Sequence, residues 1–182
     1  MSCNKIMKKI LLLSDTHGHI DERMLVYAEA ADEIWHAGDI GDLMVTDTLA
    51  KIKPLRAVYG NIDGAAARVQ FPENNCFTLE GVNFFMTHIG GPAGKYSPRV
   101  RALLDQAPPH VFICGHSHIL KVMQVKSRSL LHLNPGAAGV QGFHQMRTML
   151  RFEVATGKLQ NMEVIELGKR GKALAQTVQG TN

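Results

Sequence analysis

Short hydrophobic runs recur along the first third of the chain and alternate with segments of helical composition. An uninterrupted apolar run bounded by polar residues predicts a buried strand, whereas helices show apolar positions three and four residues apart. The strands predicted here are Lys9–Ser14, Glu33–His36 and Leu55–Tyr59, and the helices between them are Asp21–Ala30 and Leu43–Ile52. This alternation indicates βαβ units and a largely parallel sheet.

The pattern changes after residue 75, where predicted strands follow one another more closely. Cys76–Leu79 and Val82–Thr87 flank Glu80-Gly81, which predicts a hairpin. The other predicted elements are a helix over Ser97–Gln106 and strands at Val111–Cys114, Lys121–Val125, Leu130–Leu133, Met149–Val154 and Leu159–Ile165. Residues 169–182 predict a short helix or a loose tail. We therefore expect one α/β domain over 1–182, with its core at about 8–165.

Composition narrows the class of protein. The chain has 182 residues, of which 45% are hydrophobic and 20% charged, and this excludes disordered, collagen-like and coiled-coil proteins. The net charge of +4 lies partly at the chain ends, so a nucleic-acid partner is not expected. No apolar run is long enough for a membrane span or a secretion signal. Three widely spaced cysteines, with no C-x-x-C, favour a reduced, cytoplasmic protein.

Side chains suited to metal binding follow five of the apolar runs. In chain order they are Asp15 and His17, then Asp39, Asn61, His88, and finally His116 and His118. The carboxyl ends of parallel strands gather at one edge of a sheet, so we expect these residues to converge there. Residues two apart on extended backbone project from the same face, so the first and last pairs can each aim two ligands at one place.

The composition of this set suits a pair of metal ions. Seven side chains are too many for one ion with an open coordination position, but they suit two ions if one carboxylate bridges them. Asp39 is the best candidate for the bridge, since it stands alone at its strand end. Imidazole and oxygen ligands without a thiolate favour Mn, Fe, Zn, Ni or Co. The alternative is that these residues are caps and turn residues after strands.

Six sequence blocks occur in an order that resembles the calcineurin-like metallophosphoesterases, and in particular their small bacterial and archaeal phosphodiesterase subfamily. The blocks are Ser14–Gly18, His36–Asp39, Gly60–Asp63, His88, Gly115–His118 and Asn134–Gly136. The resemblance covers about residues 8–165. It implies a two-layer sandwich of mixed β-sheets flanked by helices, in an αββα arrangement.

The resemblance also implies ligands, cofactor and reaction. One metal would be held by Asp15, His17, Asp39 and His118, and the other by Asp39, Asn61, His88 and His116. Manganese is the first expectation for the two divalent ions, with Ni, Fe, Zn and Co as alternatives. The reaction would be hydrolysis of a phosphate ester by a metal-bridging hydroxide, with Asp39 and Asn61 among the catalytic residues.

Two positions depart from the family pattern. Many phosphatases of this superfamily carry a histidine acid directly after the G-N asparagine, and here that position is Ile62. Without this acid, substrates with poor leaving groups should react slowly, unless His19 or Asp63 substitutes. Ile89 is inserted between His88 and the following glycine. His19 and Arg99 are also predicted to contact the substrate.

The most specific hypothesis is a phosphodiesterase that acts on small phosphodiesters. One alternative is a phosphomonoesterase or a nuclease on the same site. Another is a non-catalytic scaffold, because a retromer subunit has this fold and fold alone does not establish activity. A scaffold can lose metal ligands, whereas all seven positions are filled here, which favours an enzyme. A homodimer or higher homo-oligomer is a further expectation.

Overall fold

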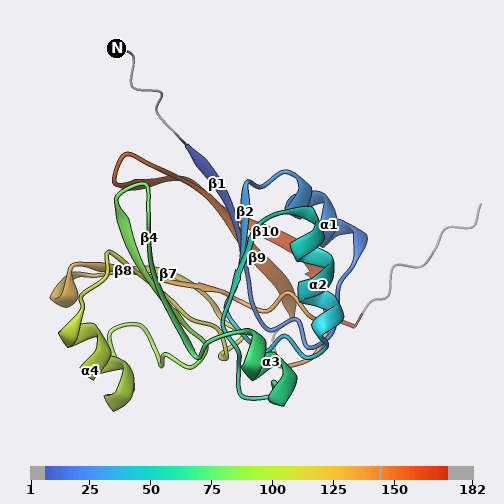
Figure 1. The fold of residues 1–182 in the computed structure, drawn as a ribbon, viewed down its shortest axis with the longest axis horizontal. Coiled ribbons are helices and arrows are strands. Elements are labelled where there is room, and N and C mark those ends of the chain that lie inside the picture. The colour runs from blue at the N-terminus through green and yellow to red at the C-terminus, as the bar shows by residue number, and fades with distance from the viewer. Residues whose placement is uncertain (1–6, 144, 172–182) are drawn as a thin grey trace, which may run out of the picture.

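Two mixed β-sheets form the centre of the molecule in the computed structural model, which describes residues 7–143 and 145–171 (Figure 1). The first sheet has the order β10-β9-β1-β2-β3, with bounds Lys158–Lys169, Met146–Ala155, Lys8–Leu13, Glu33–His36 and Leu55–Ala57. The second has the order β4-β5-β6-β8-β7, with bounds Asn74–Leu79, Val82–Thr87, Val111–Ile113, Leu130–Pro135 and Leu120–Val125. Strands β1, β2 and β3 are parallel in the first sheet, and strands β5, β6 and β8 are parallel in the second. The remaining strands pair antiparallel with their neighbours.

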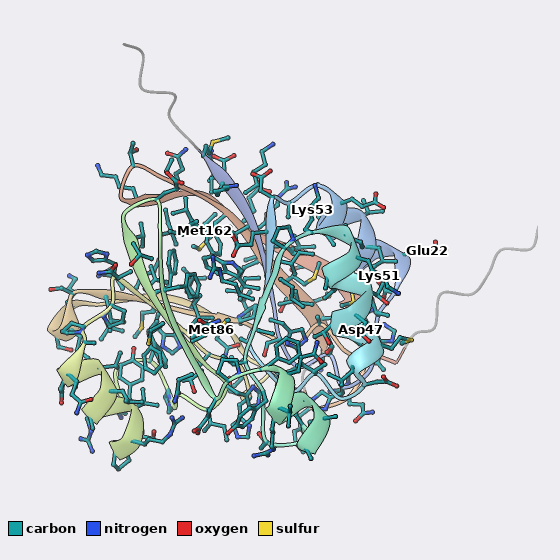
Figure 2. All side chains as sticks on the ribbon, in the orientation of Figure 1. Glu22, Asp47, Lys51, Lys53, Met86 and Met162 are labelled. Atoms are coloured by element: carbon teal, nitrogen blue, oxygen red, sulfur yellow. The ribbon has the colours of Figure 1, made fainter. Side chains whose placement is uncertain are left out.

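Strand β1 shows why the sheets lie in the interior. Ile10 and Leu12 pack between the two sheets, whereas Leu11 and Leu13 pack against the helices on the other face. Successive side chains of a strand point to opposite faces, so a strand covered on both sides reads as an uninterrupted apolar run. Figure 2 places Met86 of β5 in the same layer between the sheets, where it is fully buried.

Helices cover the outer face of each sheet. Helices α1 (Glu22–Glu29) and α2 (Leu43–Ile52) lie against the first sheet, and α4 (Pro98–Gln106) lies against the second (Figure 1). The side chains of Asp21, Asp42 and Ser97 cap these helices by accepting backbone N–H groups of the first turn. The fold is therefore the αββα sandwich that the resemblance implies.

Local differences from the sequence prediction occur at short or irregular elements. The hairpin at Glu80-Gly81 is confirmed, since both residues have the positive φ angles of a tight primed turn (46° and 80°). Helix α3 (Ala65–Gln70) and the 3₁₀ turn at Lys126–Arg128 were not predicted. Strand β10 continues to Lys169, and residues 172–182 of the predicted helix or tail lie outside the described residues. Over the described ranges, no helix is long and apolar enough to cross a membrane.

Candidate metal centre

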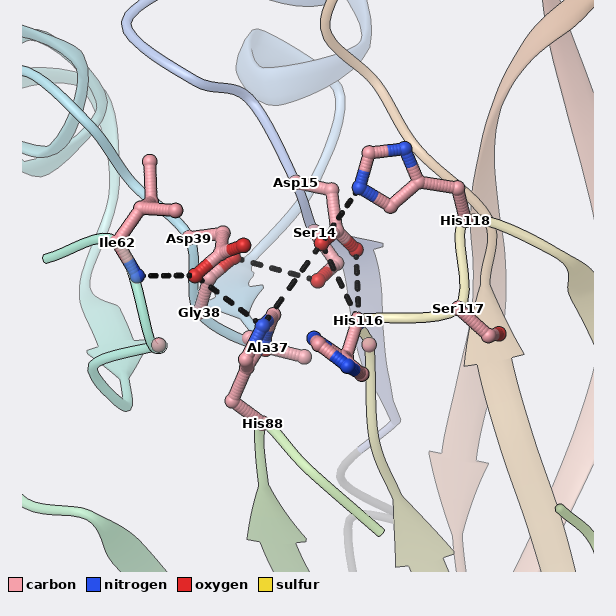
Figure 3. A network of polar contacts seen from close by, with 12 residues as sticks. Ser14, Asp15, Ala37, Gly38, Asp39, Ile62, His88, His116, Ser117 and His118 are labelled. Carbon is pink, nitrogen blue, oxygen red and sulfur yellow. Dashed lines mark hydrogen bonds and ion pairs between the residues drawn. The ribbon is translucent and has the colours of Figure 1, made fainter. Parts of the chain in front are cut away.

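Loops at the carboxyl ends of strands from both sheets meet at one place (Figure 3). Asp15 and His17 follow β1, and Asp39 follows β2 in the same sheet. His88, His116 and His118 come from the loops after β5 and β6 of the other sheet. Their ligand atoms form two groups, each within 4.8 Å, namely Asp15, His17, Asp39 and His118, and Asp39, His88 and His116. Asp39 belongs to both groups, which is the position expected of a bridging carboxylate.

Five of these residues have a left-handed backbone, which is uncommon outside glycine. Their φ angles are 54° at Asp15, 49° at His17, 53° at Asp39, 67° at His116 and 57° at His118. A non-glycine residue in this region costs about 1 to 3 kcal/mol, and such residues cluster at functional sites. The strained backbone turns the side chains toward a common centre at the expense of local stability.

Backbone groups of opposite loops hold the two carboxylates in place. The Asp15 carboxylate accepts the N–H of His116, at 3.2 Å from each oxygen, and Asp39 Oδ1 accepts the N–H of Ile62 at 3.1 Å (Figure 3). A Cβ at Gly60 would lie 2.1 Å from Asp39 Oδ1. Only glycine permits this approach, which explains the glycine at the end of β3.

His88 shows that the site is built to receive a cation. Its Nδ1 donates to the carbonyl of Ala37 at 2.8 Å, so Nε2 is the ring nitrogen available to a metal. This Nε2 is buried and lies 3.1 Å from Asp39 Oδ1, yet it has no hydrogen-bond partner among the described residues. An unpartnered buried nitrogen beside a carboxylate is costly in a metal-free protein. A divalent cation would satisfy both groups, so the residues present fit a metal site.

The electrostatics favour metal-binding protonation states at Asp39 and His17 but not at His88. Burial would lower the pKa of His88, but its contact with Asp39 and the charges of Asp15 and Asp39 raise it, so a bound cation would displace the proton from Nε2. Burial alone would raise the pKa of Asp39, but His88, the Ile62 N–H and His17 together hold this pKa below its ordinary value. Burial lowers the pKa of His17, and this outweighs the opposite effect of Asp39 and Asp15. At neutral pH Asp39 is therefore an anion and His17 is neutral. Metal ligands need these forms.

Asn61, the remaining predicted ligand, lies at the mouth of the site. It is exposed and directly follows Gly60, the residue that packs against Asp39. Together with His88 it lines a cavity of about 290 Å³. Asn61 thus shares a cavity with His88, a member of the second group, and its role as a ligand stays a prediction.

Asp63 lies behind the site rather than at its mouth. The side chain is buried, and its oxygens accept the backbone N–H groups of Ile40, Gly41 and Gly60 at 3.1, 2.8 and 2.7 Å. These contacts join the loop after β2 to the loop after β3. The carboxylate therefore holds two ligand-bearing loops together, and its role as a substitute acid stays a prediction.

The two residues predicted to contact the substrate, His19 and Arg99, both make hydrogen bonds or ion pairs within the protein. His19 Nε2 lies 3.2 Å from Asp21 Oδ2, and His19 belongs to neither metal group. Arg99 lines the 290 Å³ cavity, and its guanidinium donates to the Thr87 hydroxyl and the carbonyl of Ile89. The contacts of Arg99 thus hold both neighbours of His88. The substrate-binding roles of His19 and Arg99 stay predictions.

His36 is a supporting residue to which sequence reasoning assigned no site role. Its Nδ1 accepts the N–H of Gly38 at 3.2 Å, so the proton lies on Nε2 and is donated to the Thr16 hydroxyl at 2.9 Å. Thr16 in turn donates to the carbonyl of Ile40 at 3.0 Å. Burial lowers the pKa of His36 to about 4, consistent with a neutral ring. This chain ties the loop after β1 to the loop after β2.

A buried histidine outside the site should make stability depend on pH. His132 in β8 hydrogen-bonds Tyr96, and burial, helped by Lys121, lowers the pKa of His132 from 6.5 to about 4. Between these values the unfolded chain binds the proton and the folded chain does not, so stability falls as pH falls. For metal-free protein, we expect His132 alone to account for a loss of about 2 to 3 kcal/mol between pH 7 and pH 4.5.

Urea unfolding at the two pH values measures this loss. His132→Asn should lose less stability on acidification than the wild-type chain, whatever its stability at pH 7. Equal losses in the two proteins would contradict the prediction.

Comparison with known proteins gives a consistent result. Residues 7–157 match the family model described as the calcineurin-like phosphoesterase superfamily domain. A relative from Mycoplasma pneumoniae, named "Probable metallophosphoesterase", is 28% identical over 167 residues, which cover 86% of this chain and 96% of the relative.

Solved structures share the fold. A structure described as a novel archaeal phosphodiesterase has a TM-score of 0.65 at 21% identity, over 87% of this chain and 99% of its own. Vps29 from Entamoeba histolytica, in complex with Zn²⁺, has a TM-score of 0.63 at 16% identity, over 87% of this chain and 98% of its own. At these identities the likeness extends to the fold and not to the activity.

Proposed function

Because the chain belongs to the calcineurin-like phosphoesterase superfamily, we propose that it is a metal-dependent phosphodiesterase that hydrolyses small phosphodiesters. The observation that carries the proposal is the placement of Asp39 in two groups of metal-binding atoms. A site with two adjacent cations suits displacement at phosphorus, since each can stabilise charge on a different oxygen. The archaeal phosphodiesterase of the same fold is in line with this proposal.

The proposed ligand sets follow the two groups. Asp15, His17, Asp39 and His118 would hold one ion, and Asp39, His88 and His116 the other. The family resemblance adds Asn61 to the second set. Manganese is the first candidate, with Ni, Fe, Zn and Co as alternatives. When bound, the ions supply Lewis acidity and activate a water molecule near neutral pH.

The chain's own residues prepare this site. The Ala37 carbonyl fixes the proton of His88 on Nδ1, so that Nε2 faces Asp39. Asp63 and His36 hold the loops that carry the ligands. These contacts preorganise the site before substrate arrives, and preorganisation is a large part of catalysis at charged transition states.

The mouth of the site favours activated diesters. Ile62, at the position of the family's histidine acid, is 46% exposed and has no proton to donate to a leaving group. Leaving groups that are stable as anions do not need such a donor. Monoesters and diesters with basic leaving groups should therefore be poorer substrates.

Metal dependence tests the proposal directly. Chelator-stripped protein should hydrolyse bis-p-nitrophenyl phosphate only after Mn²⁺ is restored. The proposed preference for diesters predicts slower hydrolysis of p-nitrophenyl phosphate, which releases the same leaving group. His116→Ala should lose this activity and keep the fold. Preference for the monoester would favour a phosphomonoesterase. Inactivity with Mn²⁺, Ni²⁺, Co²⁺ and Zn²⁺ would contradict the proposal and favour a scaffold, as the likeness to Vps29 would allow.

The same proposal covers the domain, the cellular location, the substrate and the partners of the protein. We place it in one domain over 1–182, with its core at about 8–165, in the cytoplasm and with a small phosphate ester as substrate. A homodimer or higher homo-oligomer stays a prediction, and nucleic acid is not an expected partner. Size-exclusion chromatography with light scattering would measure the oligomeric state.

A further inference from the structure

A second cavity, of about 370 Å³, opens directly beside the candidate metal centre. His116 is common to both, since it lines this cavity and belongs to the group with Asp39 and His88. Pro92 and Ala93, in the loop after β5, also line the cavity. A group bound in the cavity would thus be adjacent to a phosphoryl group held at the metal centre.

The lining of this cavity is largely apolar. Besides Pro92 and Ala93, it includes Ile119, whose side chain is 65% exposed and directly follows His118. The buried ring of His132 also contributes, and it stacks on the ring of Tyr96 with centroids 5.8 Å apart. Residues of three separate segments thus give the cavity a mainly apolar wall, and ligand cavities are typically lined by apolar side chains with a few polar groups.

The loop after β5 separates this cavity from the 290 Å³ cavity that contains Asn61. Ile89 lines the smaller cavity, whereas residues 91–93 line the larger one. The rings of His88 and His116 lie 5.3 Å apart, and each lines one of the two cavities. Two separate cavities therefore open beside the candidate metal centre, one lined by His88 and the other by His116.

We propose that the 370 Å³ cavity binds an apolar, ring-bearing ester arm of the substrate, an inference that rests on the proposed phosphodiesterase function. Ligand cavities commonly measure about 300 to 1,000 Å³, so this one suits a single ring system, from phenyl to nucleobase in size, better than a long acyl chain. The substrate class is then a phosphodiester with one aromatic or heteroaromatic arm. Dialkyl phosphates would leave the cavity empty.

Two diesters with the same leaving group measure the preference of the cavity. Ethyl p-nitrophenyl phosphate and phenyl p-nitrophenyl phosphate both release p-nitrophenol and differ in the arm that stays on phosphorus. We expect the Mn²⁺-loaded protein to favour the phenyl diester in kcat/KM by at least about tenfold. Comparing this ratio between variants cancels the difference in intrinsic reactivity.

Two variants alter the cavity from different segments of the chain. Ala93→Phe fills the cavity, and Ile119→Ser removes an apolar contact from it. Each variant should lower the phenyl-to-ethyl ratio of kcat/KM at least about fivefold, because contacts to one small apolar group change kcat/KM by about tenfold or more. Val122→Ser is the matched control, because Val122 is 43% exposed in β7 and does not line the cavity. Unchanged ratios in both cavity variants, or an equal fall in the control, would overturn the proposal.

Ring binding can also be measured without turnover. In saturation-transfer NMR with metal-free protein, the ring protons of phenyl methylphosphonate should receive saturation from the wild-type chain and from Val122→Ser, but not from Ala93→Phe. Ring binding without diester hydrolysis would support the cavity and refute the proposed function. Hydrolysis without either ring binding or arm preference would refute the cavity and leave the proposed function intact.

Discussion

Asp39→Asn should lower the hydrolysis of bis-p-nitrophenyl phosphate by at least about a thousandfold, equivalent to about 4 kcal/mol of transition-state stabilisation. Asp39 is the residue shared by the two groups of candidate ligands, with Oδ1 3.1 Å from His88 Nε2 and Oδ2 3.9 Å from His17 Nε2. The amide removes a negative charge and replaces one acceptor oxygen by a donor. Both ions would lose a ligand at once, so the effect should exceed that of replacing any histidine of the site.

Measurement of bound metal distinguishes this cause from unfolding. Asp39→Asn should retain less than the wild-type content of Mn²⁺ after gel filtration, while its circular dichroism stays the same. Asp47→Asn is the control, because Asp47 is exposed on α2 and belongs to neither group of candidate ligands (Figure 2). A variant at Asp39 with wild-type turnover would refute the assignment of the site.

The convergence of the polar side chains that follow the strands could be predicted from the sequence because the signal at each strand end is local. Each buried strand ends at a polar residue, and parallel strands must bring such ends to one edge of the sheet. The structure places Asp15, Asp39 and His88 together as this reasoning required. The two-layer arrangement of sheets could not be predicted from any single hydrophobic run. It was expected because the order of the motifs resembles that of a known family.

What the sequence left out depends on backbone geometry. Left-handed backbone at Asp15 or His118 cannot be read from residue type, since these residues prefer other conformations. Strand β10 contains register shifts between Gln160 and Glu163, and irregularities of this kind break the alternation by which strands are found. Helix α3 has only six residues and no side-chain cap, so neither a hydrophobic pattern nor a capping residue could predict it.

Asp63 shows that the role of a residue near the site also depends on contacts that the sequence does not reveal. Its spacing after Asn61 made it a candidate acid, but the partners that decide its role are backbone N–H groups from two loops. Sequence carries no record of which backbone group meets a given carboxylate. The position of Asp63 in a motif therefore does not establish its role, which has to be tested by experiment.

Asp63→Ala should lower the free energy of unfolding of metal-free protein by about 3 to 5 kcal/mol. The substitution leaves the buried N–H groups of Ile40 and Gly60 and the part-buried N–H of Gly41 without an acceptor. Each unsatisfied buried group costs about 1 to 3 kcal/mol. Urea unfolding at pH 7 measures the change. Asp105→Ala is the control, because Asp105 makes an exposed ion pair with Arg128, and such pairs contribute at most about 1 kcal/mol.

Leaving-group dependence then separates a positioning role from an acid role for Asp63. Asp63→Asn keeps one acceptor oxygen, and by perturbing the loops that carry Asp39 and Asn61 it should slow diesters of p-nitrophenol and of phenol by the same factor. A proton donor matters more as the leaving group becomes more basic, so loss of an acid would slow the phenol diester more. A selective loss on that substrate would make Asp63 the acid that replaces the missing histidine. A uniform loss would confirm that this carboxylate acts by holding the loops.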